Sequence, residues 1–315
     1  MVSAEDFRKR LDALNRGPLP QPGEPGADLD EIRRRIRRLR REAPRRLGEP
    51  VVYRRNLPRA AGPVAAPPRT PSGPPVVLEK ATSGTEAVAP HGGRAYVVVN
   101  RLEEAGEPWA ALSLAFGRKL LTDGARLAQF ACADREPRPM LPEEIVFLDL
   151  ETTGLASTPL FLIGTMVWEG GSLVLRQYFA RDYAEERAVI SLFLAAAADK
   201  RLLVSFNGKS FDLPYIRMRA AANAVPFAVS LGHLDMVHAC RRAWRRTLPD
   251  CKLQTLESHV CGRARHGDIH GSEIPDAYHA FVRTGNAAQI VQILEHNMMD
   301  LATLAELLIR IPVEA

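Results

Sequence analysis

The sequence of 315 residues predicts an α/β protein whose core is a mixed β-sheet flanked by helices. From residue 144 onward, three apolar runs of strand length follow closely, and only Glu169-Gly170-Gly171 separates the second from the third. An Ala-rich segment over 185–198 then leads to a fourth apolar run. Short connections join antiparallel strands and helical crossovers join parallel ones, so the pattern predicts both kinds of pairing.

The expected elements follow the hydrophobic pattern along the chain. Apolar runs predict strands over residues 145–150, 162–168, 173–179 and 202–206, with a crossover helix over 185–198. Apolar residues at helical spacing predict helices over residues 212–223, 233–246, 253–261, 276–284 and 287–309. We expect the last of these helices to be broken near Met298.

The chain before residue 144 divides into two parts by composition. Residues 1–75 contain 13 of the 24 prolines, and such a segment cannot bury enough apolar surface to offset the entropy of ordering. We expect a disordered Pro/Arg-rich arm there. Strand-like runs at 76–78 and 95–99 predict a small β-rich subdomain over 76–140, in which residues 110–121 fit either a strand or a helix. The α/β domain then covers residues 144–310.

The basic charge is concentrated near the N-terminus. Residues 1–80 carry a net charge of +8, the remaining residues carry −3, and nine arginines lie within 33–46. Residues 29–42 have the spacing of a short amphipathic helix that an aspartate could cap. Three interpretations stay open: a solvated charged helix, an arm that binds phosphates, and a docking element for a protein partner.

The composition also argues against several classes of protein. No apolar run approaches the length of a membrane-spanning helix, and residues 1–16 have no apolar signal core. The four cysteines lack a paired CxxC spacing, which favours free thiols in a reducing compartment. We therefore expect a cytoplasmic protein without a membrane partner.

Two acids at the end of the first strand of the α/β domain indicate a metal site. Asp149 and Glu151 follow the apolar run 145–148, and a spacing of two places both side chains on one face of a strand. Burying two neighbouring carboxylates is costly unless positive charge compensates them. Oxygen ligands suit Mg²⁺ or Mn²⁺ rather than zinc. Taken alone, the same pair also fits a turn or a helix cap.

Further acids lie downstream in suggestive places. Asp212 follows the apolar run 202–206, where it could also act as a simple helix N-cap. His296 and Asp300 are four residues apart, so they share one helix face. If the four acids converge, two metal ions roughly 4 Å apart would hold the attacking and leaving oxygens of a phosphoryl displacement. His296 could then accept the proton of the attacking water, or it could be an ordinary structural histidine.

Together these motifs resemble the DEDD exonuclease superfamily, whose fold is RNase H-like. Asp149, Glu151, Asp212 and Asp300 match its four acids in order. Within the superfamily, roughly residues 144–310 resemble the YprB-like group of predicted exonucleases. That closer match rests on the segments Asp149–Leu155, Phe161–Gly164, Ser205–Pro214 and Asp268–Pro275, and on His296-Asn297.

The resemblance implies an RNase H-like sheet, two Mg²⁺ or Mn²⁺ ions, and 3′–5′ exonuclease activity on single-stranded ends of DNA or RNA. It also implies that His296 is the general base. The family, however, places a histidine five residues or a tyrosine four residues before the last acid, and here a histidine stands at the tyrosine spacing. Two other functions stay open: a nucleic-acid-binding module with little catalysis, and a structure-specific endonuclease.

Residues that flank the acids are candidates for substrate contact: Thr152, Thr153, Gly154, Phe161, Asn207, Lys209 and Phe211. The resemblance implies that the first three meet the terminal nucleotide, and a simple turn is the alternative. Asn207 and Lys209 could contact phosphate. The two phenylalanines could stack on a base, or they could belong to the core.

A basic segment and a further acid lie between residues 231 and 246. Its arginines either line a nucleic-acid groove or form a solvated helix face: Arg241, Arg242, Arg245 and Arg246. Asp235, next to the apolar residues 231–234, could support the metal site from behind its ligands.

Overall fold

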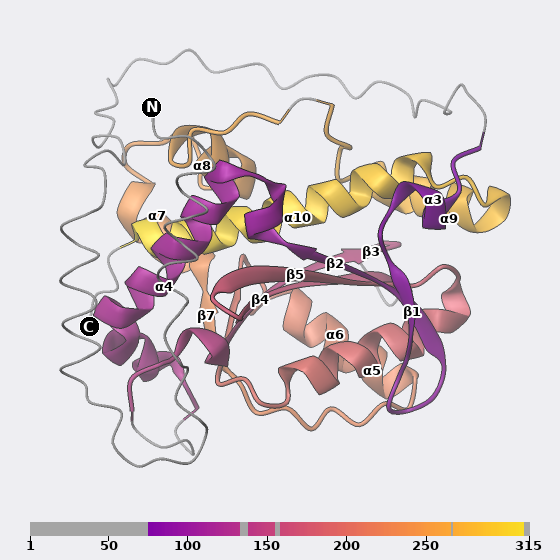
Figure 1. Cartoon of the computed structure of the whole chain (residues 1–315), viewed down its shortest axis with the longest axis horizontal. Helices are drawn as coiled ribbons and strands as arrows, with labels where there is room; N and C mark the ends of the chain where they lie inside the picture. Colours follow the sequence, from indigo (N-terminus) through magenta and orange to yellow (C-terminus); the bar gives the residue numbers. More distant parts are fainter. Residues whose placement is uncertain (1–74, 133–137, 155–157, 266, 312–315) are drawn as a thin grey trace, which may run out of the picture. The chain divides into compact units, whose positions relative to one another are not determined.

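Seven strands form one mixed sheet in the computed structural model, which describes residues 75–132, 138–154, 158–265 and 267–311 (Figure 1). The strand order is β1-β2-β5-β4-β3-β6-β7. The neighbours β3/β6 and β6/β7 are parallel, and the remaining pairs are antiparallel. The strands are β1 (Thr85–Val88), β2 (Arg94–Arg101), β3 (Ile145–Thr152), β4 (Leu160–Glu169), β5 (Ser172–Phe179), β6 (Leu202–Ser205) and β7 (Gly232–Asp235).

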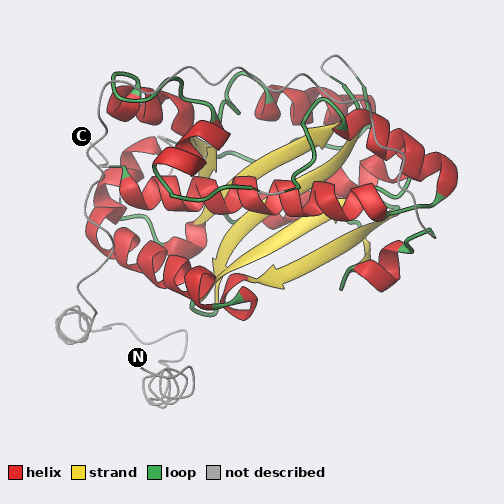
Figure 2. Ribbon diagram, turned by 90° about the horizontal axis from the view of Figure 1, so that it is seen from above, coloured by secondary structure: helices red, strands yellow, loops and turns green. Residues whose placement is uncertain are grey.

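Helices cover both faces of the sheet (Figures 1 and 2). One face packs against α4 (Glu107–Leu127), α7 (Met236–Trp244), α8 (Leu253–His259) and the long α10 (Ala288–Arg310), which crosses β3 and β4. The other face packs against α5 (Glu186–Ala197) and α6 (Asp212–Ala222). The two remaining α-helices of the described residues are α3 (Leu78–Ala81) and α9 (Ile274–Thr284).

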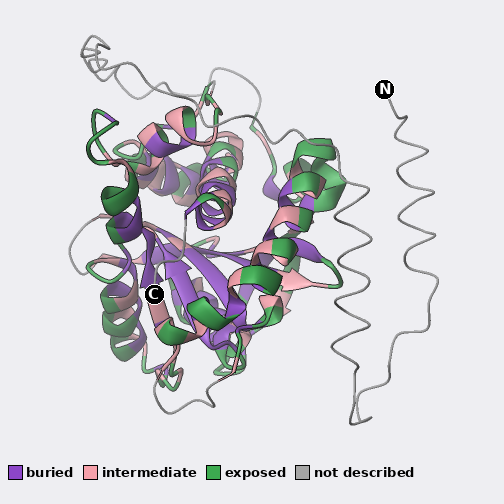
Figure 3. Ribbon diagram, turned by 90° about the vertical axis from the view of Figure 1, so that its left-hand side faces the viewer, coloured by how far each residue is buried: buried purple, intermediate pink, exposed green. Residues whose placement is uncertain are grey.

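The alternation of side chains along β3 divides the core into two. Val146 and Leu148 are buried in the cluster that contains α5, whereas Ile145 and Phe147 are buried in the cluster that contains the C-terminal half of α10. Both faces of this central strand are therefore covered. Figure 3 shows that most of the sheet is buried. Double-sided burial explains the unbroken apolar run in the sequence. The next residue in the Ile145–Phe147 series is Asp149, which accordingly faces α10.

The predicted fold class is confirmed. The four expected strands between residues 145 and 206 lie within two residues of β3, β4, β5 and β6, and the crossover helix matches α5. Gly170 and Gly171 have φ values of 60° and 87° at the β4–β5 connection. A tight hairpin needs this left-handed backbone, and glycine adopts it without steric cost.

Residues 76–140 do not form a sheet of their own. Strand β2 pairs with β5, with Tyr96 opposite Phe179, so β1 and β2 extend the same seven-stranded sheet. The strand expected at 76–78 is wrong, because α3 begins at residue 78. The ambiguous residues 110–121 lie within α4, whose buried Leu112, Phe116 and Leu120 recur every four residues.

Two expectations for the C-terminal half are also wrong. Residues 232–235 form the edge strand β7, where the sequence pattern predicts the start of a helix, and the parallel ladder with β6 outweighs local propensity. The last helix, α10, continues through Met298 without a break. It contains neither proline nor glycine, the residues that commonly kink helices.

The proposed basic arm, residues 1–75, lies outside the described residues except for its last residue. Within the described ranges, no helix is both long enough and apolar enough to cross a membrane. All four cysteines are free, as expected.

Candidate active site

The carboxylates of Asp149 and Glu151 project from the end of β3 toward α10. Both residues are half-buried, and the β3–β4 pairing shifts register between Glu151 and Thr152. Such irregularities bend a strand and redirect its side chains. Asn297 of α10 donates a hydrogen bond from Nδ2 to Oδ2 of Asp149 at 2.8 Å. The sheet and α10 therefore hold the first acid between them.

A tight loop after β6 brings Asp212 to the same edge of the sheet, because the carboxyl ends of the parallel strands β3 and β6 meet there. The buried carboxylate of Asp235, at the end of β7, accepts the backbone N–H groups of Asn207 at 2.8 Å and Lys209 at 3.1 Å. Gly208 leaves room for the acid, since a Cβ there would lie 2.6 Å from Oδ2 of Asp212. Asp235 thus supports the loop that precedes Asp212.

His296 and Asp300 share one face of α10, with 3.5 Å between Nε2 and Oδ2. On its other side, Nδ1 of His296 lies 2.9 Å and 3.0 Å from the two carboxylate oxygens of Asp268. A carboxylate can only accept, so Nδ1 carries the hydrogen in this contact. Asp268 therefore orients the imidazole so that Nε2 faces the acid site.

Arg265 links the two acids that flank His296. Its Nη2 donates to Oδ1 of Asp300 at 2.5 Å, and its Nη1 donates to Oδ2 of Asp268 at 3.3 Å. The buried carboxylate of Glu257 accepts from Nε at 2.6 Å and anchors the guanidinium from behind. The site thus contains a positive charge fixed in a network of carboxylates.

The acids at the end of β3 share one electrostatic environment. Burial raises the pKa of Asp149 well above its ordinary value, and the charges of Asp300, Glu151 and Asp212 raise it further. Burial raises the pKa of Glu151 to about 8; His296 opposes the shift, and Asp300 and Asp212 add to it. Burial, followed by the charge of Asp235, raises the pKa of Asp212 to about 7. Within the described residues, no cationic side chain forms an ion pair with Asp149, Glu151 or Asp212 to compensate these charges.

The pKa of His296 is also raised, and for an imidazole this shift favours the charged form. Burial alone would favour the neutral imidazole, but the hydrogen bond to Asp268 and the charges of Asp300 and Glu151 outweigh it and raise the pKa of His296. The pKa of Asp268 is lowered: burial opposes its ionisation, and the contacts with His296 and Arg265 overcome that effect. These two residues therefore form a charge-stabilised pair beside the other acids.

The carboxylates of the candidate site have the chemistry that a hard divalent cation requires. Carboxylate oxygens are the ligands of Mg²⁺ and Mn²⁺, and within the described residues Asp149, Glu151 and Asp212 form no ion pair with a cationic side chain. In the same part of the chain, no three His, Cys, Asp or Glu side chains are already arranged to hold a metal ion. The carboxylate of Asp300 is instead bonded to Arg265.

The residues expected to contact substrate have different surroundings. Oγ1 of Thr152 donates to the main-chain oxygen of Gly154 at 2.8 Å, and Oγ1 of Thr153 donates to that of Pro159 at 3.1 Å, so both hydroxyl hydrogens serve the turn. Asn207 and Lys209 are exposed.

The two phenylalanines differ in exposure. Phe211 is half-buried, with its ring 5.2 Å from that of Tyr215. Phe161 is fully buried and stacks on Tyr278 with 4.0 Å between ring centres, so of its two interpretations the core position is confirmed.

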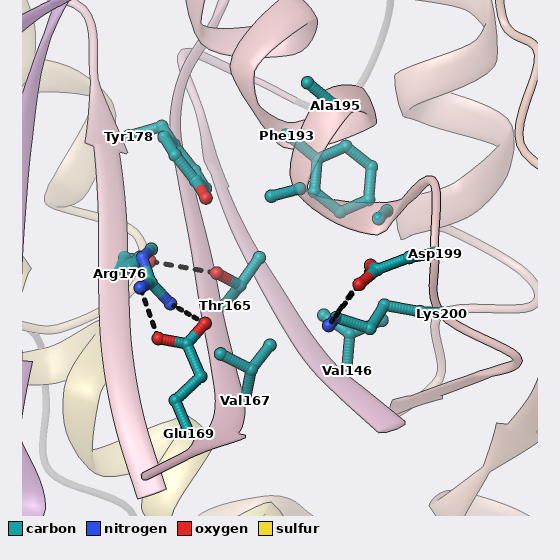
Figure 4. A pocket seen from close by; sticks show the side chains of 12 residues that line it. Val146, Thr165, Val167, Glu169, Arg176, Tyr178, Phe193, Ala195, Asp199 and Lys200 are labelled. Atoms are coloured by element: carbon teal, nitrogen blue, oxygen red, sulfur yellow. Dashed lines mark hydrogen bonds and ion pairs between the residues drawn. The ribbon is translucent and has the colours of Figure 1, made fainter. Parts of the chain in front are cut away.

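Neither of two cavities in the described structure encloses the four acids. One of about 260 Å³ lies between the opposite face of the sheet and α5, where Tyr178, Arg176, Glu169 and Lys200 line it (Figure 4). A second, of about 220 Å³, is lined by Arg265, Asp268 and the outer side of α10. The second cavity therefore borders the network around His296.

Sequence reasoning assigned no role to four residues that hold the site together: Arg265, Asp268, Asn297 and Gln177. Nε2 of Gln177 donates to Oδ1 of Asn297 at 2.9 Å. Asp268 and Asn297 do lie in segments that carry the family resemblance, so a signal for them was present in the sequence. Arg265 and Gln177 had no such signal, because only the fold brings them to the acids.

Comparison with known proteins places these observations in a family. The family model described as RNase_H superfamily matches residues 146–311. The uncharacterized protein YprB of Bacillus subtilis (strain 168) is 31% identical over 170 residues, which cover 52% of this chain and 41% of that protein. This chain therefore aligns with about two fifths of the curated relative's length.

A solved structure also resembles part of the chain. The family B DNA polymerase from the hyperthermophilic archaeon Pyrobaculum calidifontis aligns with a TM-score of 0.42 and 16% identity, over 54% of this chain and 24% of that one. The family match covers β3 to α10, the elements that carry all four acids and His296. The chain belongs to the RNase_H superfamily.

Proposed function

We propose that the chain is a metal-dependent 3′–5′ exonuclease that hydrolyses phosphodiester bonds at single-stranded ends of DNA or RNA. One observation carries the proposal: Asp149 and Glu151 of β3 lie close to Asp212 of α6 and Asp300 of α10 at the edge where β3 and β6 end, so the charges of these two acids add to burial in raising the pKa of Asp149 and Glu151. Membership of the superfamily supports a nuclease. The direction of attack, the free end and the use of two cations come from the resemblance of the four acids to those of DEDD enzymes.

The side chains have separate roles in this proposal. Asp149, Glu151, Asp212 and Asp300 would hold two Mg²⁺ or Mn²⁺ ions, which supply an activated water and stabilise charge on the phosphate. His296 would accept the proton of the attacking water at Nε2, because Asp268 occupies Nδ1.

Exposed basic residues support a nucleic-acid substrate. On α7 and just after it, four exposed arginines form no ion pair within the described residues: Arg241, Arg242, Arg245 and Arg246. Such a cluster of exposed cations without acidic partners favours a polyanionic ligand such as a nucleic-acid backbone. The exposed Lys209 and Asn207, beside Asp212, would meet phosphates nearer the reacting bond.

A specific contact favours a second candidate, a nucleic-acid-binding module with little catalysis. Arg265 is bonded to Asp300, one of the four acids that a cation would need. If this ion pair persists in the presence of Mg²⁺ or Mn²⁺, the protein would bind strands without cleaving them. The two candidates thus differ in whether the cation displaces Arg265 from Asp300.

End-labelled strands distinguish the candidates. Single-stranded DNA and RNA, labelled at either the 5′ or the 3′ end, would be incubated with Mg²⁺, Mn²⁺ or EDTA, beside a circular strand. The proposal expects mononucleotides released first from the 3′ end, an intact circle and no products in EDTA. Cleavage of the circle would indicate an endonuclease. Strand binding without products in any metal would support the binding module.

A further inference from the structure

Asn297 reaches Asp149 through a gap that a glycine leaves in the surface of the sheet. Asp149, Gly164 and Gln177 are direct cross-strand partners on β3, β4 and β5, so they form one row on the face toward α10. Asn297 has no exposed surface and lies over the middle of this row. A Cβ at Gly164 would lie 2.0 Å from Oδ1 of Asn297, so only glycine leaves room for it.

The hydrogen bonds of the row permit one orientation of both amides. Nε2 of Gln177 donates at 2.7 Å to the main-chain oxygen of Leu294, which can only accept. The same nitrogen donates to Oδ1 of Asn297 at 2.9 Å. Nδ2 of Asn297 must therefore face Asp149, and it lies 2.8 Å from Oδ2. The main-chain oxygen of Leu294 thus sets the orientation of the Gln177 amide. That amide in turn sets the orientation of Asn297, whose Nδ2 donates to Asp149.

We infer that Asn297 is a positioning residue that holds Asp149 for a divalent cation, and that Gln177 sets its orientation. The inference rests on the proposed function. A hydrogen-bond donor favours the ionised carboxylate and restricts its rotation, and it leaves Oδ1 of Asp149 for a ligand. Such partners of ligating carboxylates tune metal affinity although they never touch the metal. The same row explains why a glycine stands at position 164.

Calorimetric titration of the full chain with Mn²⁺ tests the inference without substrate. Asn297→Asp replaces the donor with a carboxylate oxygen, and Gln177→Glu removes the donor that orients Asn297. Each variant should bind Mn²⁺ about 10–100-fold more weakly, the usual scale for losing such a partner. Each should also lower kcat with little change in KM. Gln289→Ala, an amide in the first turn of the same helix, is the matched control and should bind Mn²⁺ like the wild type.

A swapped pair separates the hydrogen-bonded row from metal binding. When Asn297→Asp and Asp149→Asn are combined, the carboxylate on α10 accepts from Gln177 and from the amide on β3, so each bond of the row is restored. In metal-free protein, Asn297→Asp should lower the melting temperature and the swapped pair should recover it. Mn²⁺ affinity should not recover, because the carboxylate has left β3.

The outcomes distinguish this inference from the function on which it rests. Unchanged Mn²⁺ affinity in both single variants of a wild-type protein that binds Mn²⁺ and cleaves would overturn the inference alone. So would a swapped pair no more stable than the sum of its single changes. A wild-type protein that neither binds Mn²⁺ nor cleaves, with stability recovered in the swapped pair, would reject both the proposed function and the positioning role.

Discussion

The two faces of the sheet differ in whether their acidic side chains have cationic partners. On the face toward α5, Arg176 binds Glu169 through two hydrogen bonds of 2.8 Å and 2.6 Å, and Lys200 lies 3.1 Å from Asp199. On the face toward α10, Asp149 and Glu151 lie in a group of four acids that has a single arginine partner within the described residues, Arg265 on Asp300.

The difference between the two faces shows that carboxylates without cationic partners locate this candidate site better than the larger cavity does. The larger of the two cavities lies on the balanced face, where each acid has a cation (Figure 4). On the other face, burial and then the charges of neighbouring carboxylates raise the pKa of Asp149 and Glu151, which is costly for folding unless a ligand compensates it.

Removing any one of the four acids of the candidate site should abolish cleavage. The variants are Asp149→Ala, Glu151→Ala, Asp212→Ala and Asp300→Ala, and each removes an oxygen ligand proposed for the cations. Because the acids repel one another without metal, Glu151→Ala and Asp212→Ala should melt no lower than the wild type in EDTA. Asp149→Ala should melt lower, because it removes the carboxylate that accepts from the buried Nδ2 of Asn297. Asp199→Ala on the balanced face is the control. Wild-type turnover in any of the four would show that this residue is not a metal ligand.

His296→Ala should slow cleavage by about 10²–10⁴-fold, the scale for a lost general base, with Mn²⁺ affinity nearly unchanged. Asp268→Asn should slow it less, since it removes only the group that orients the imidazole. His238→Ala, on the exposed side of α7, should have no effect. Rates would be measured from pH 6 to 9 at saturating substrate. An unaltered rate for His296→Ala would mean that another group takes the proton.

The metal-free protein should lose stability as the pH rises. Folding raises the pKa of Glu151 from its ordinary 4.5 to about 8, so between these values the folded chain retains a proton that the unfolded chain has released. Stability then falls as pH increases through that window. Melts in EDTA should show a smaller fall for Glu151→Gln than for the wild type, and Glu295→Gln serves as an exposed control. A wild-type melting temperature that does not fall over this range would contradict the raised pKa.

The smallest effect concerns binding by the arginines of α7. Replacing Arg241 and Arg245 with alanine should reduce the slope of log K against log salt by about 0.7 for each phosphate contact on a single strand. Cleavage at saturating strand concentration should stay close to wild type, because neither side chain belongs to the group of acids. Arg187→Ala with Arg283→Ala, two exposed arginines elsewhere, is the matched control. Equal slopes in both pairs would make the α7 arginines an ordinary solvated face.

Local sequence rules were sufficient for a large part of the fold and of the candidate site. Period-two alternation placed Asp149 and Glu151 on one face of a strand, and the four-residue spacing placed His296 beside Asp300; the structure has both arrangements. They follow from the geometry of one strand or one helix turn, so no distant residue can change them. The same rules failed at β7, a four-residue edge strand whose pairing with β6 depends on a segment almost thirty residues away.

Tertiary structure alone decided which groups the acids meet. Asn297 contacts Asp149 across a separation of 148 residues, and Gln177 contacts Asn297 across 120. No local pattern encodes such pairs, because they arise only when α10 packs over β3, β4 and β5. The sequence by itself therefore determined the four acids, their order and the faces they occupy. Packing determined their charge balance, through Arg265 on Asp300 and an amide donor on Asp149, because each of these contacts joins segments that meet only in the folded chain.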